Sequence, residues 1–403
     1  MTLTTRSQRA CPLSRRAVLG GAAAAAAVST LNAPFVLAQP ARIKLGLMLP
    51  YSGTFAALGN NITDAMIQAI NEKGGKLGGR EVQYVRLDDE SEPPKAAQNA
   101  NKLVVGEKVD ILVGTVHSGV AMGMVQVVRE EGTTLIIPNA GAGAATGALC
   151  AANIFRTSFS NWQPSFPMAK VMYDLGHRNV VTMTWKYAAG DEAIGGFKDG
   201  FTKLGGKIAK EIAIPFPDVE FQAHLTEIAS LKPDAVFVFF AGGGAVKFVK
   251  DYDAAGLRKT IPLYGSGFLT DGTLKAQGAA AEGLLTTLHY VEDLPNPVNQ
   301  KFSADFKKAT NRDVDVYAVQ GYDTGQLLVQ ALDAVKGDTR AKPALHAAMR
   351  NAKIVSPRGD WTFSKAQNPV QDIYLRKVVN GENKYQSVAH KGLEDPATGC
   401  KLA

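Results

Sequence analysis

A short sequence pattern occurs twice in this chain, about 125 positions apart. The sequence Lys76-Leu77-Gly78-Gly79 returns as Lys203-Leu204-Gly205-Gly206. After each copy, an Asp introduces an apolar run that enters a glycine-rich loop, over residues 110–119 and then 234–245. This repetition predicts two similar α/β lobes. Because ligands of α/β folds bind at the carboxyl ends of parallel strands, we expect a ligand cleft between the lobes at these loops.

The first 38 residues have the features of an export signal. Adjacent Arg15 and Arg16 precede a small, apolar stretch, and Val36-Leu37-Ala38 ends in the small-x-small pattern of signal peptidase sites. We therefore predict that residues 1–38 are a cleavable twin-arginine signal peptide and that the mature protein is periplasmic. An uncleaved membrane anchor is the alternative. It is disfavoured because the stretch is only weakly apolar and is interrupted by Asn32 and Pro34.

The basic charge of the chain comes largely from this segment, which holds four arginines and no acidic residue. Without it, the net charge falls from +7 to +3, because 40 basic residues then face 37 acidic ones. Neither this value nor the distribution of Lys and Arg predicts binding to nucleic acid or to a membrane surface. The roughly 365 remaining residues suit two domains.

Two cysteines, Cys150 and Cys400, remain after the loss of Cys11. In an oxidising compartment they can form one disulfide, although two unpaired thiols are also compatible with the sequence. The six histidines are scattered singly and show no metal-ligand spacing, so we expect no metal or other cofactor.

Strand and helix patterns alternate along the chain, which predicts right-handed crossovers and parallel sheets. The chain leaves the first lobe near residues 154–157, returns near 286–290 and crosses again near 355–357. We predict an α/β fold of two Rossmann-like lobes with parallel central sheets, joined by a three-segment hinge. Residues 39–157 and 287–355 form lobe 1, and residues 158–286 and 356–403, with the C-terminal tail, form lobe 2.

This pattern resembles the type I periplasmic binding proteins of the leucine/isoleucine/valine-binding family, which are solute receptors of ABC importers. The resemblance covers essentially all of the mature chain. It rests on the order of six short pieces: Leu49-Pro50-Tyr51-Ser52-Gly53, Gly114-Thr115-Val116-His117-Ser118, Ile154-Phe155-Arg156-Thr157, Tyr187-Ala188-Ala189-Gly190, Gly321-Tyr322-Asp323 and Gly359-Asp360-Trp361-Thr362-Phe363. It implies a monomer of the Venus-flytrap type, a small carboxylate ligand, and permease subunits in the inner membrane as partners.

The resemblance also implies a ligand site. In the family, a serine in the position of Ser118 binds the ligand carboxylate, and the amides of Gly119 and Val120 would face the anion at a helix start. An ordinary N-cap serine is the alternative. The family's next hydroxyl falls at Gly141, so Asn139 or backbone amides would serve instead. The expected ligand-binding residues are Leu58, Val116, His117, Ser118, Asn139, Ala140, Gly141, Trp162, Tyr187, Gly243, Gly267 and Phe268.

One departure from the family bears on the ligand. The acidic side chain that pairs with the ammonium of an amino acid falls here at Gly267 or Phe268, and an unpaired buried ammonium costs several kcal/mol. Asp271 could substitute, which keeps branched-chain amino acids as an alternative. Phe268 and Tyr187 instead offer aromatic surfaces, and the glycines of residues 242–244 would make room for a flat ligand. We therefore expect an aromatic acid of the benzoate, hydroxybenzoate or cinnamate/coumarate type.

A ligand-sensing receptor and an enzyme are the two alternative functions. A ligand-sensing receptor component would use the same two lobes. An enzyme is disfavoured, because the sequence has no G-x-G-x-x-G, no P-loop Lys-Ser/Thr and no G-x-S-x-G elbow. Asp323, in one of the family pieces, reads either as a helix N-cap or as a ligand contact.

Overall fold

The computed structural model of this protein describes residues 2–3 and 42–402, and every element named below lies within the compact unit Ala41–Ala403. The expected signal segment therefore lies outside the described residues, apart from positions 2 and 3, and stays a prediction. Within the described ranges, no helix is both long and apolar enough to cross a membrane.

The first sheet has six strands in the order β2-β3-β1-β4-β5-β6. All neighbours pair in parallel except β2 and β3. The strands are β1 (Ile43–Leu49), β2 (Lys76–Leu77), β3 (Arg80–Asp88), β4 (Ile111–Gly114), β5 (Thr134–Ile137) and β6 (Ile154–Arg156). The connecting helices are α1 (Ala56–Asn71), α2 (Pro93–Asn101), α3 (Ser118–Glu131) and α4 (Gly143–Thr146).

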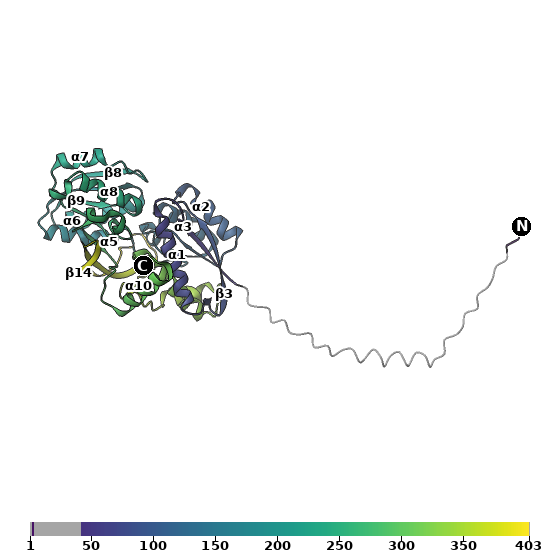
Figure 1. Cartoon of the computed structure of the whole chain (residues 1–403). Helices are drawn as coiled ribbons and strands as arrows, with labels where there is room; N and C mark the ends of the chain where they lie inside the picture. Colours follow the sequence, from purple (N-terminus) through teal and green to yellow (C-terminus); the bar gives the residue numbers. More distant parts are fainter. Residues whose placement is uncertain (1, 4–41, 403) are drawn as a thin grey trace. The chain divides into compact units, whose positions relative to one another are not determined.

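The second sheet runs β12-β13-β11-β10-β9-β7-β8, and β14 pairs with β13. Its strands are β7 (Asn179–Lys186), β8 (Lys207–Pro215), β9 (Ala235–Phe239), β10 (Leu263–Ser266), β11 (Leu285–Leu288), β12 (Trp361–Phe363), β13 (Pro369–Val379) and β14 (Glu382–Leu393). Its helices are α5 (Trp162–Asp174), α6 (Ala188–Lys203), α7 (Gln222–Leu231), α8 (Gly242–Ala254) and α9 (Leu274–Gln277). In Figure 1 the teal elements α6, α7, α8, β8 and β9 group apart from the blue and purple α1, α2 and α3.

The duplication in the sequence is a duplication of topology. The parallel strands run β3-β1-β4-β5-β6 in one lobe and β8-β7-β9-β10-β11 in the other, so each lobe has the same strand order in its own numbering. Asp110 and Asp234 also make equivalent hydrogen bonds at the start of the first strand of their lobes. The Asp110 carboxylate accepts from the Lys44 amide at 2.8 Å, and the Asp234 carboxylate accepts from the Asn179 amide at 2.9 Å. The α/β fold of two parallel-sheet lobes is confirmed, with antiparallel strands added at β2, β12, β13 and β14.

The two copies of the opening motif nevertheless differ locally. Lys76-Leu77 forms the short strand β2, which pairs back onto β3, whereas Lys203 ends α6 and Leu204 is its C-cap. Both copies still lead into the second strand of their lobe, β3 or β8. The shared residues therefore mark a common position in the topology rather than a common local structure.

Three helices follow the second crossing: α10 (Pro297–Thr310), α11 (Val316–Ala334) and α12 (Lys342–Arg350). The α11 helix packs closely along α1 of the first lobe, because a Cβ at Gly321 would lie 2.2 Å from the Ile62 carbonyl oxygen. A Cβ at Gly325 would likewise lie 2.5 Å from the Met66 carbonyl oxygen. The lobe boundaries expected from the sequence stay predictions, because sheet membership locates the crossings without fixing their end residues.

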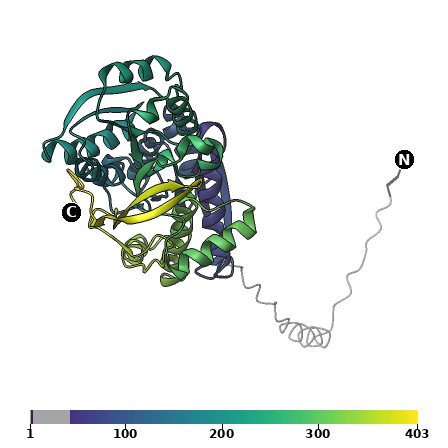
Figure 2. The same ribbon diagram turned by 60° about the vertical axis from the view of Figure 1, so that its left-hand side comes forward.

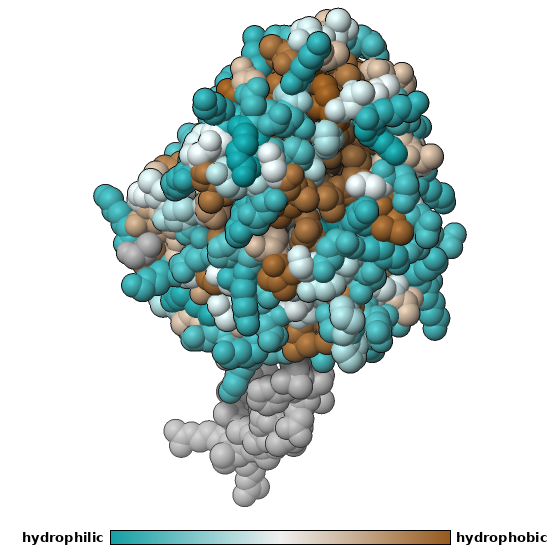
Figure 3. All heavy atoms as spheres, turned by 90° about the vertical axis from the view of Figure 1, so that its left-hand side faces the viewer, coloured by the Kyte–Doolittle hydropathy of each residue, from teal (hydrophilic) through white to brown (hydrophobic). Residues whose placement is uncertain are grey.

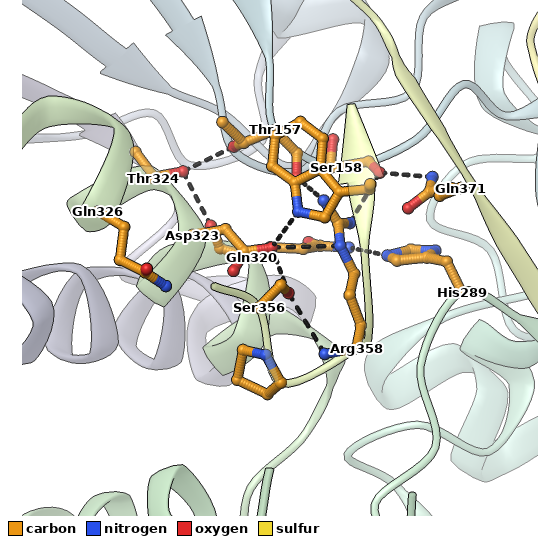
Figure 4. A network of polar contacts seen from close by, with 12 residues as sticks. Thr157, Ser158, His289, Gln320, Asp323, Thr324, Gln326, Ser356, Arg358 and Gln371 are labelled. Atoms are coloured by element: carbon orange, nitrogen blue, oxygen red, sulfur yellow. Dashed lines mark hydrogen bonds and ion pairs between the residues drawn. The ribbon is translucent and has the colours of Figure 1, made fainter. Parts of the chain in front are cut away.

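A buried polar network joins α11 to the three crossing segments (Figure 4). Asp323 forms an ion pair with Arg358 at 3.1 Å and accepts a hydrogen bond from Ser356 at 2.9 Å. Arg358 in turn donates to the Thr157 and Ser158 carbonyls, at 2.7 and 3.0 Å. Asp323 lies inside α11, so the reading of this residue as an N-cap is wrong, and its contact with a ligand stays a prediction. The N-cap of α11 is Asp315.

The chain ends on the yellow β13–β14 ribbon and a short tail (Figure 2). The tail carries Cys400, whose sulfur is bonded to that of Cys150, which follows α4 of the first lobe. The predicted disulfide is thus confirmed, and it closes a sequence separation of 250 residues. Because β14 belongs to the second sheet, the bridge ties the end of lobe 2 to lobe 1.

Apolar packing continues from one lobe into the other. One buried cluster contains Leu49, Phe55 and Leu58 from the first lobe together with Trp185 and Phe239 from the second. The surface is mixed: on the face in Figure 3, hydrophilic side chains surround smaller apolar areas.

Candidate ligand-binding site

A cavity lies at the carboxyl ends of the strands, between loops of both sheets. The cavity volume is about 20 Å³, well below the roughly 300–1,000 Å³ found for ligand pockets, so the lobes or the wall side chains must move apart to admit a ring-sized ligand. The lining residues are Phe55, Leu58, Val116, Ser118, Asn139, Gly141, Phe159, Asn161, Tyr187, Ala189, Phe239, Ala241, Phe268 and Tyr317. A larger, open depression is lined by Asp64, Glu72 and Arg312 among others, and its lining residues belong to α1, α10 and the segments that follow these helices, with none in a strand. The enclosed cavity is therefore the candidate site.

Ser118 lies at the first turn of α3 and is buried, with 1% of its surface exposed. Asn161 donates from Nδ2 to the Ser118 hydroxyl oxygen at 3.2 Å and to Glu192 Oε2 at 2.8 Å. Because the Ser118 oxygen accepts from Asn161, its own proton is free for an acceptor in the cavity. Burial raises the pKa of Glu192, which also accepts from the Gly143 amide at 2.9 Å.

The helix cap beside Ser118 is His117. Its Nδ1 accepts a hydrogen bond from the Gly119 amide at 3.0 Å, and the ring packs 4.9 Å from that of Tyr187. The expectation that the Gly119 amide faces an anion is therefore wrong, since His117 occupies it, and Ser118 is not the N-cap. Burial lowers the pKa of His117 to about 4. The ring is thus neutral at pH 7, with an unprotonated Nδ1 accepting the amide.

Gly141 is a glycine because Asn161 fills the space beside it. A Cβ at position 141 would lie 2.3 Å from Asn161 Oδ1, and the Asn161 amide donates to the Gly141 carbonyl at 2.8 Å. Where the family resemblance implies a hydroxyl, this protein therefore places the Asn161 side chain. Asn161 was not predicted from the sequence, because this residue follows a crossing strand and belongs to no recognised motif.

Asn139 starts a chain of buried amides that leads out of the cavity. Its Nδ2 donates to Gln320 Oε1 at 2.7 Å, and Gln320 Nε2 lies 3.0 Å from His289 Nε2. Burial lowers the pKa of His289 well below its usual value, so that ring is neutral. The chain thus joins a cavity residue to α11 and to the second crossing segment, and Figure 4 shows its part between Gln320 and His289.

Aromatic rings form most of the remaining wall. Phe268 lies 4.7 Å from Phe159, 6.1 Å from Phe239 and 6.2 Å from Tyr317, measured between ring centroids. Tyr187 is half-buried, and burial raises its pKa, so it remains a neutral phenol. Such rings favour edge and face contacts with a flat apolar ligand.

Five of the residues expected in the site do not line the cavity: His117, Ala140, Trp162, Gly243 and Gly267. Trp162 instead stacks on Phe166 at 4.3 Å, with its indole N–H toward Asp199. The amide of Ala140 donates to the Thr115 carbonyl, which buries this residue beneath the loop.

The three glycines of residues 242–244 do not enlarge the cavity. A Cβ at Gly242 would lie 2.6 Å from the Thr54 carbonyl oxygen, and one at Gly244 would lie 2.1 Å from the Trp185 ring. The missing side chain of Gly243 faces Thr54 in the same way, at 3.2 Å. These glycines let the first lobe and Trp185 pack against α8, so the expectation that they make room for a ligand is wrong.

Asp271 has no free carboxylate for a ligand. It forms a fully buried ion pair with Arg376, and its Oδ1 accepts from the Val316 amide at 2.7 Å. Arg376 also donates to the carbonyl of Gly267, one of the two positions where the resemblance places the family's acid, at 2.8 Å. A Cβ at Gly267 would lie 2.5 Å from Leu288 Cβ and 2.7 Å from Arg376 Nη2. Leu288 and the guanidinium thus occupy the space that a side chain at this position would need.

Two lobes of the same strand order that enclose one cavity define a two-lobed solute-binding protein. The family model described as "Periplasmic binding protein" matches residues 42–383. The chain therefore belongs to the periplasmic binding protein family, and it is the substrate-binding protein of an ABC transporter. It has the type I fold of that family.

Three relatives indicate where in the family it lies. A Leu/Ile/Val-binding protein homologue of Brucella melitensis biotype 1 is 30% identical over 350 residues, which cover 85% of this chain and 88% of the relative. A solute-binding protein of R. palustris, solved in complex with benzoate, is 52% identical, with a TM-score of 0.88 over 90% of this chain and all of the other. A second, from Rhodopseudomonas palustris BisB5 with 3,4-dihydroxybenzoic acid, is 31% identical, with a TM-score of 0.83 over 88% and 99% of the chains.

Proposed function

We propose that this protein captures an aromatic carboxylate of the benzoate, hydroxybenzoate or cinnamate/coumarate type between its two lobes and delivers it to an inner-membrane permease. The observation that carries the proposal is the cavity wall. It combines the Ser118 hydroxyl at the start of α3 with the rings of Phe159, Phe239 and Phe268. The benzoate complex of the 52% identical relative supports the same ligand class.

In this proposal, the carboxylate accepts from Ser118, whose proton Asn161 leaves free. The positive end of the α3 dipole lies at the same place and favours an anion. The aromatic ring of the ligand then packs against Phe268, Phe159 and Phe239, where apolar burial contributes affinity. A ligand held by loops of both lobes binds the closed arrangement better than the open one, so binding stabilises closure.

An α-amino acid suits this cavity less well. Its ammonium would need an acidic partner, and Asp271 is already held by Arg376. The relatives named as Leu/Ile/Val-binding proteins keep this reading as the alternative that an experiment must test. The periplasmic location of the family supports the predicted export, and we propose a monomer that acts through its transporter.

The test is a thermal-shift and calorimetric comparison of benzoate, 4-hydroxybenzoate and cinnamate with leucine and valine. A ligand present at 100 times its Kd raises the free energy of unfolding by about 2.7 kcal/mol. We expect stabilisation by at least one aromatic acid and none by the amino acids. Stabilisation by leucine or valine alone would overturn the proposal.

The Ser118→Ala variant tests the carboxylate contact. Because a hydrogen bond to a charged group contributes about 1.5–3 kcal/mol, the affinity for the aromatic acid should fall roughly 10- to 150-fold. The matched control is Ser230→Ala, at an exposed serine near the end of α7 whose hydroxyl bonds only to Glu227 of its own helix. Equal affinities of the two variants would contradict the role of Ser118.

A further inference from the structure

One polar group in the wall of the cavity has no partner. The Tyr317 side chain is 1% exposed, and its hydroxyl makes no hydrogen bond to any of the described residues. Buried hydroxyls are normally paired, because an unpaired one loses its hydrogen bonds to water and gains none in return. Tyr317 lines the cavity beside Phe268, so an acceptor inside the cavity can supply the missing partner.

The position of Tyr317 is fixed by its helix. It lies in the first turn of α11, where Asp315 caps the Ala318 amide at 2.8 Å and Asp271 accepts from the Val316 amide. Gln320 follows one turn later and bonds to Asn139 of the cavity. Residues three apart share a face of a helix, so Tyr317 and Gln320 both face the cavity side. The hydroxyl is therefore preorganised rather than placed by a mobile loop.

The charge around Tyr317 selects the kind of group it can bind. Asp271 and Asp315 lie near its ring and, together with burial, keep the pKa of the phenol well above its usual value, so it stays a donor. Asp271 is paired with Arg376, and burial raises the pKa of Asp315 to about 7, so no free positive charge among the residues lining the cavity attracts a ligand carboxylate to this side. The start of α3, where Ser118 lies, favours one. A carboxylate at Ser118 and a neutral polar group at Tyr317 satisfy both sites.

We propose that Tyr317 is a specificity-determining residue that hydrogen-bonds an oxygen substituent on the ring of the ligand, and that the protein therefore selects hydroxylated aromatic carboxylates over the unsubstituted acid. This inference rests on the proposed function and deepens it. Bound at the same walls, benzoate would leave the Tyr317 hydroxyl unpaired, whereas a hydroxybenzoate of the right geometry would pair it. The shared ligand chemistry is a benzene ring with one carboxylate and one phenolic hydroxyl.

The test measures the Kd of benzoate, 3-hydroxybenzoate and 4-hydroxybenzoate for the wild-type protein and for Tyr317→Phe. We expect the wild type to bind at least one hydroxybenzoate more tightly than benzoate. Removing the phenolic oxygen should weaken that hydroxybenzoate about 3- to 10-fold, within the range of a single neutral hydrogen bond, and change benzoate less than twofold. An equal loss for all three acids, or no loss for any, would overturn the inference.

A matched control separates binding from folding. Tyr252 is also fully buried, but its hydroxyl donates to the Ile261 carbonyl at 3.0 Å and does not line the cavity. Tyr252→Phe should lower the melting temperature of the ligand-free protein and leave all three Kd values unchanged. Tyr317→Phe should not lower that melting temperature, because it removes an unpaired group. A drop as large as that of Tyr252→Phe would indicate a structural role instead.

The outcomes also distinguish this inference from the proposed function. If the wild type binds none of the aromatic acids, both fail. If it binds benzoate as tightly as the hydroxybenzoates and Tyr317→Phe changes nothing, the proposed function stands and the role of Tyr317 is excluded.

Discussion

At the scale of single residues, Arg376 holds the loop that carries the cavity residue Phe268. Its guanidinium neutralises Asp271 and holds the Gly267 carbonyl, all with full burial. Where the family resemblance places the acid of amino-acid binders, this protein has Gly267, and the nearby Asp271 is held in a buried ion pair with Arg376. A buried pair of this kind is strongly destabilised when one partner is removed, because the other charge remains without compensation.

Because Asp271 pairs with Arg376, we expect its substitution to change the stability of the protein and not its preference among ligands. The Asp271→Asn variant leaves Arg376 buried with an uncompensated charge, so we expect a loss of about 3–5 kcal/mol in the free energy of unfolding by urea titration. The ratio of aromatic-acid to leucine affinity should not change in protein that is still folded. If the variant kept its stability and lost binding of an amino acid, Asp271 would be a ligand contact after all.

A second carboxyl beside this pair predicts a pH dependence. Burial raises the pKa of Glu292 to about 8, and its Oε2 is buried without a hydrogen-bond partner among the described residues, while Asn383 donates to Oε1 at 2.9 Å. As the pH rises, the unfolded chain, with a Glu pKa near 4.3, therefore loses this proton at a lower pH than the folded state does. Stability from this group is complete below about pH 4 and is lost as the pH rises to about 8.

The Glu292→Gln variant should remove that slope. We expect it to raise the melting temperature at pH 8.5 more than at pH 5, with a gain of about 1–3 kcal/mol at the higher pH, the usual cost of a buried unsatisfied group. The exposed Glu130→Gln is the control. Parallel melting curves of wild type and Glu292→Gln across this pH range would contradict the assignment.

At the scale of elements, α11 organises the molecule. Its first turn carries Tyr317, its next turn carries Gln320, and Asp323 then holds the hinge through Arg358. Close packing of α11 on α1 depends on Gly321 and Gly325, where a Cβ would meet backbone atoms of α1. One helix therefore connects the cavity, the three crossing segments and the core of the first lobe.

This packing predicts opposite effects of the same substitution in two helices. Gly321→Ala forces a Cβ against the Ile62 carbonyl and should destabilise the protein by about 1–3 kcal/mol, as overpacking typically does. Gly195→Ala, in α6, meets open space and should stabilise it by about 0.5–1 kcal/mol, because alanine favours the helix. Denaturant midpoints of the two variants on the same side of the wild type would contradict this account.

At the scale of the whole molecule, three crossings and one disulfide join the lobes. The Cys150–Cys400 bridge holds the C-terminal tail, which follows β14 of lobe 2, against lobe 1. It constrains a segment of 250 residues, and a native disulfide of a secreted domain typically contributes about 2–5 kcal/mol.

Cys150→Ser/Cys400→Ser should therefore lower the free energy of unfolding by roughly that amount under oxidising conditions. Both residues lie away from the cavity lining, so the affinity for the aromatic acid should change less than threefold. Reduction of the wild type should reproduce the stability of the variant. A large loss of affinity in the stable fraction would instead mean that the bridge sets the closure of the lobes.

Much of this organisation could be predicted from local patterns. Repeated strand-to-loop plans predicted the two lobes, because hydrophobic periodicity and turn residues act over short distances in the chain. The loss of the acidic residue at Gly267 or Phe268 was also visible in a short stretch of sequence, and it indicated a ligand other than an amino acid. Neither Asn161 nor Tyr317 stands in a motif, and each reaches the cavity only because a crossing segment or α11 returns to it.

The sequence by itself determined the α/β class, the duplicated topology, the pairing partners for a disulfide and several of the loops that line the cavity. Those features follow from composition and order along the chain. Only the tertiary structure decided which side chains face the cavity. It assigned Asp271 to Arg376, His117 to the cap of α3 and Asp323 to the hinge, and it left the Tyr317 hydroxyl unpaired. The physical reason is that a polar side chain pairs with the group that folding brings nearest. That group can be close in the sequence, as Gly119 is to His117, or 105 residues away, as Arg376 is from Asp271.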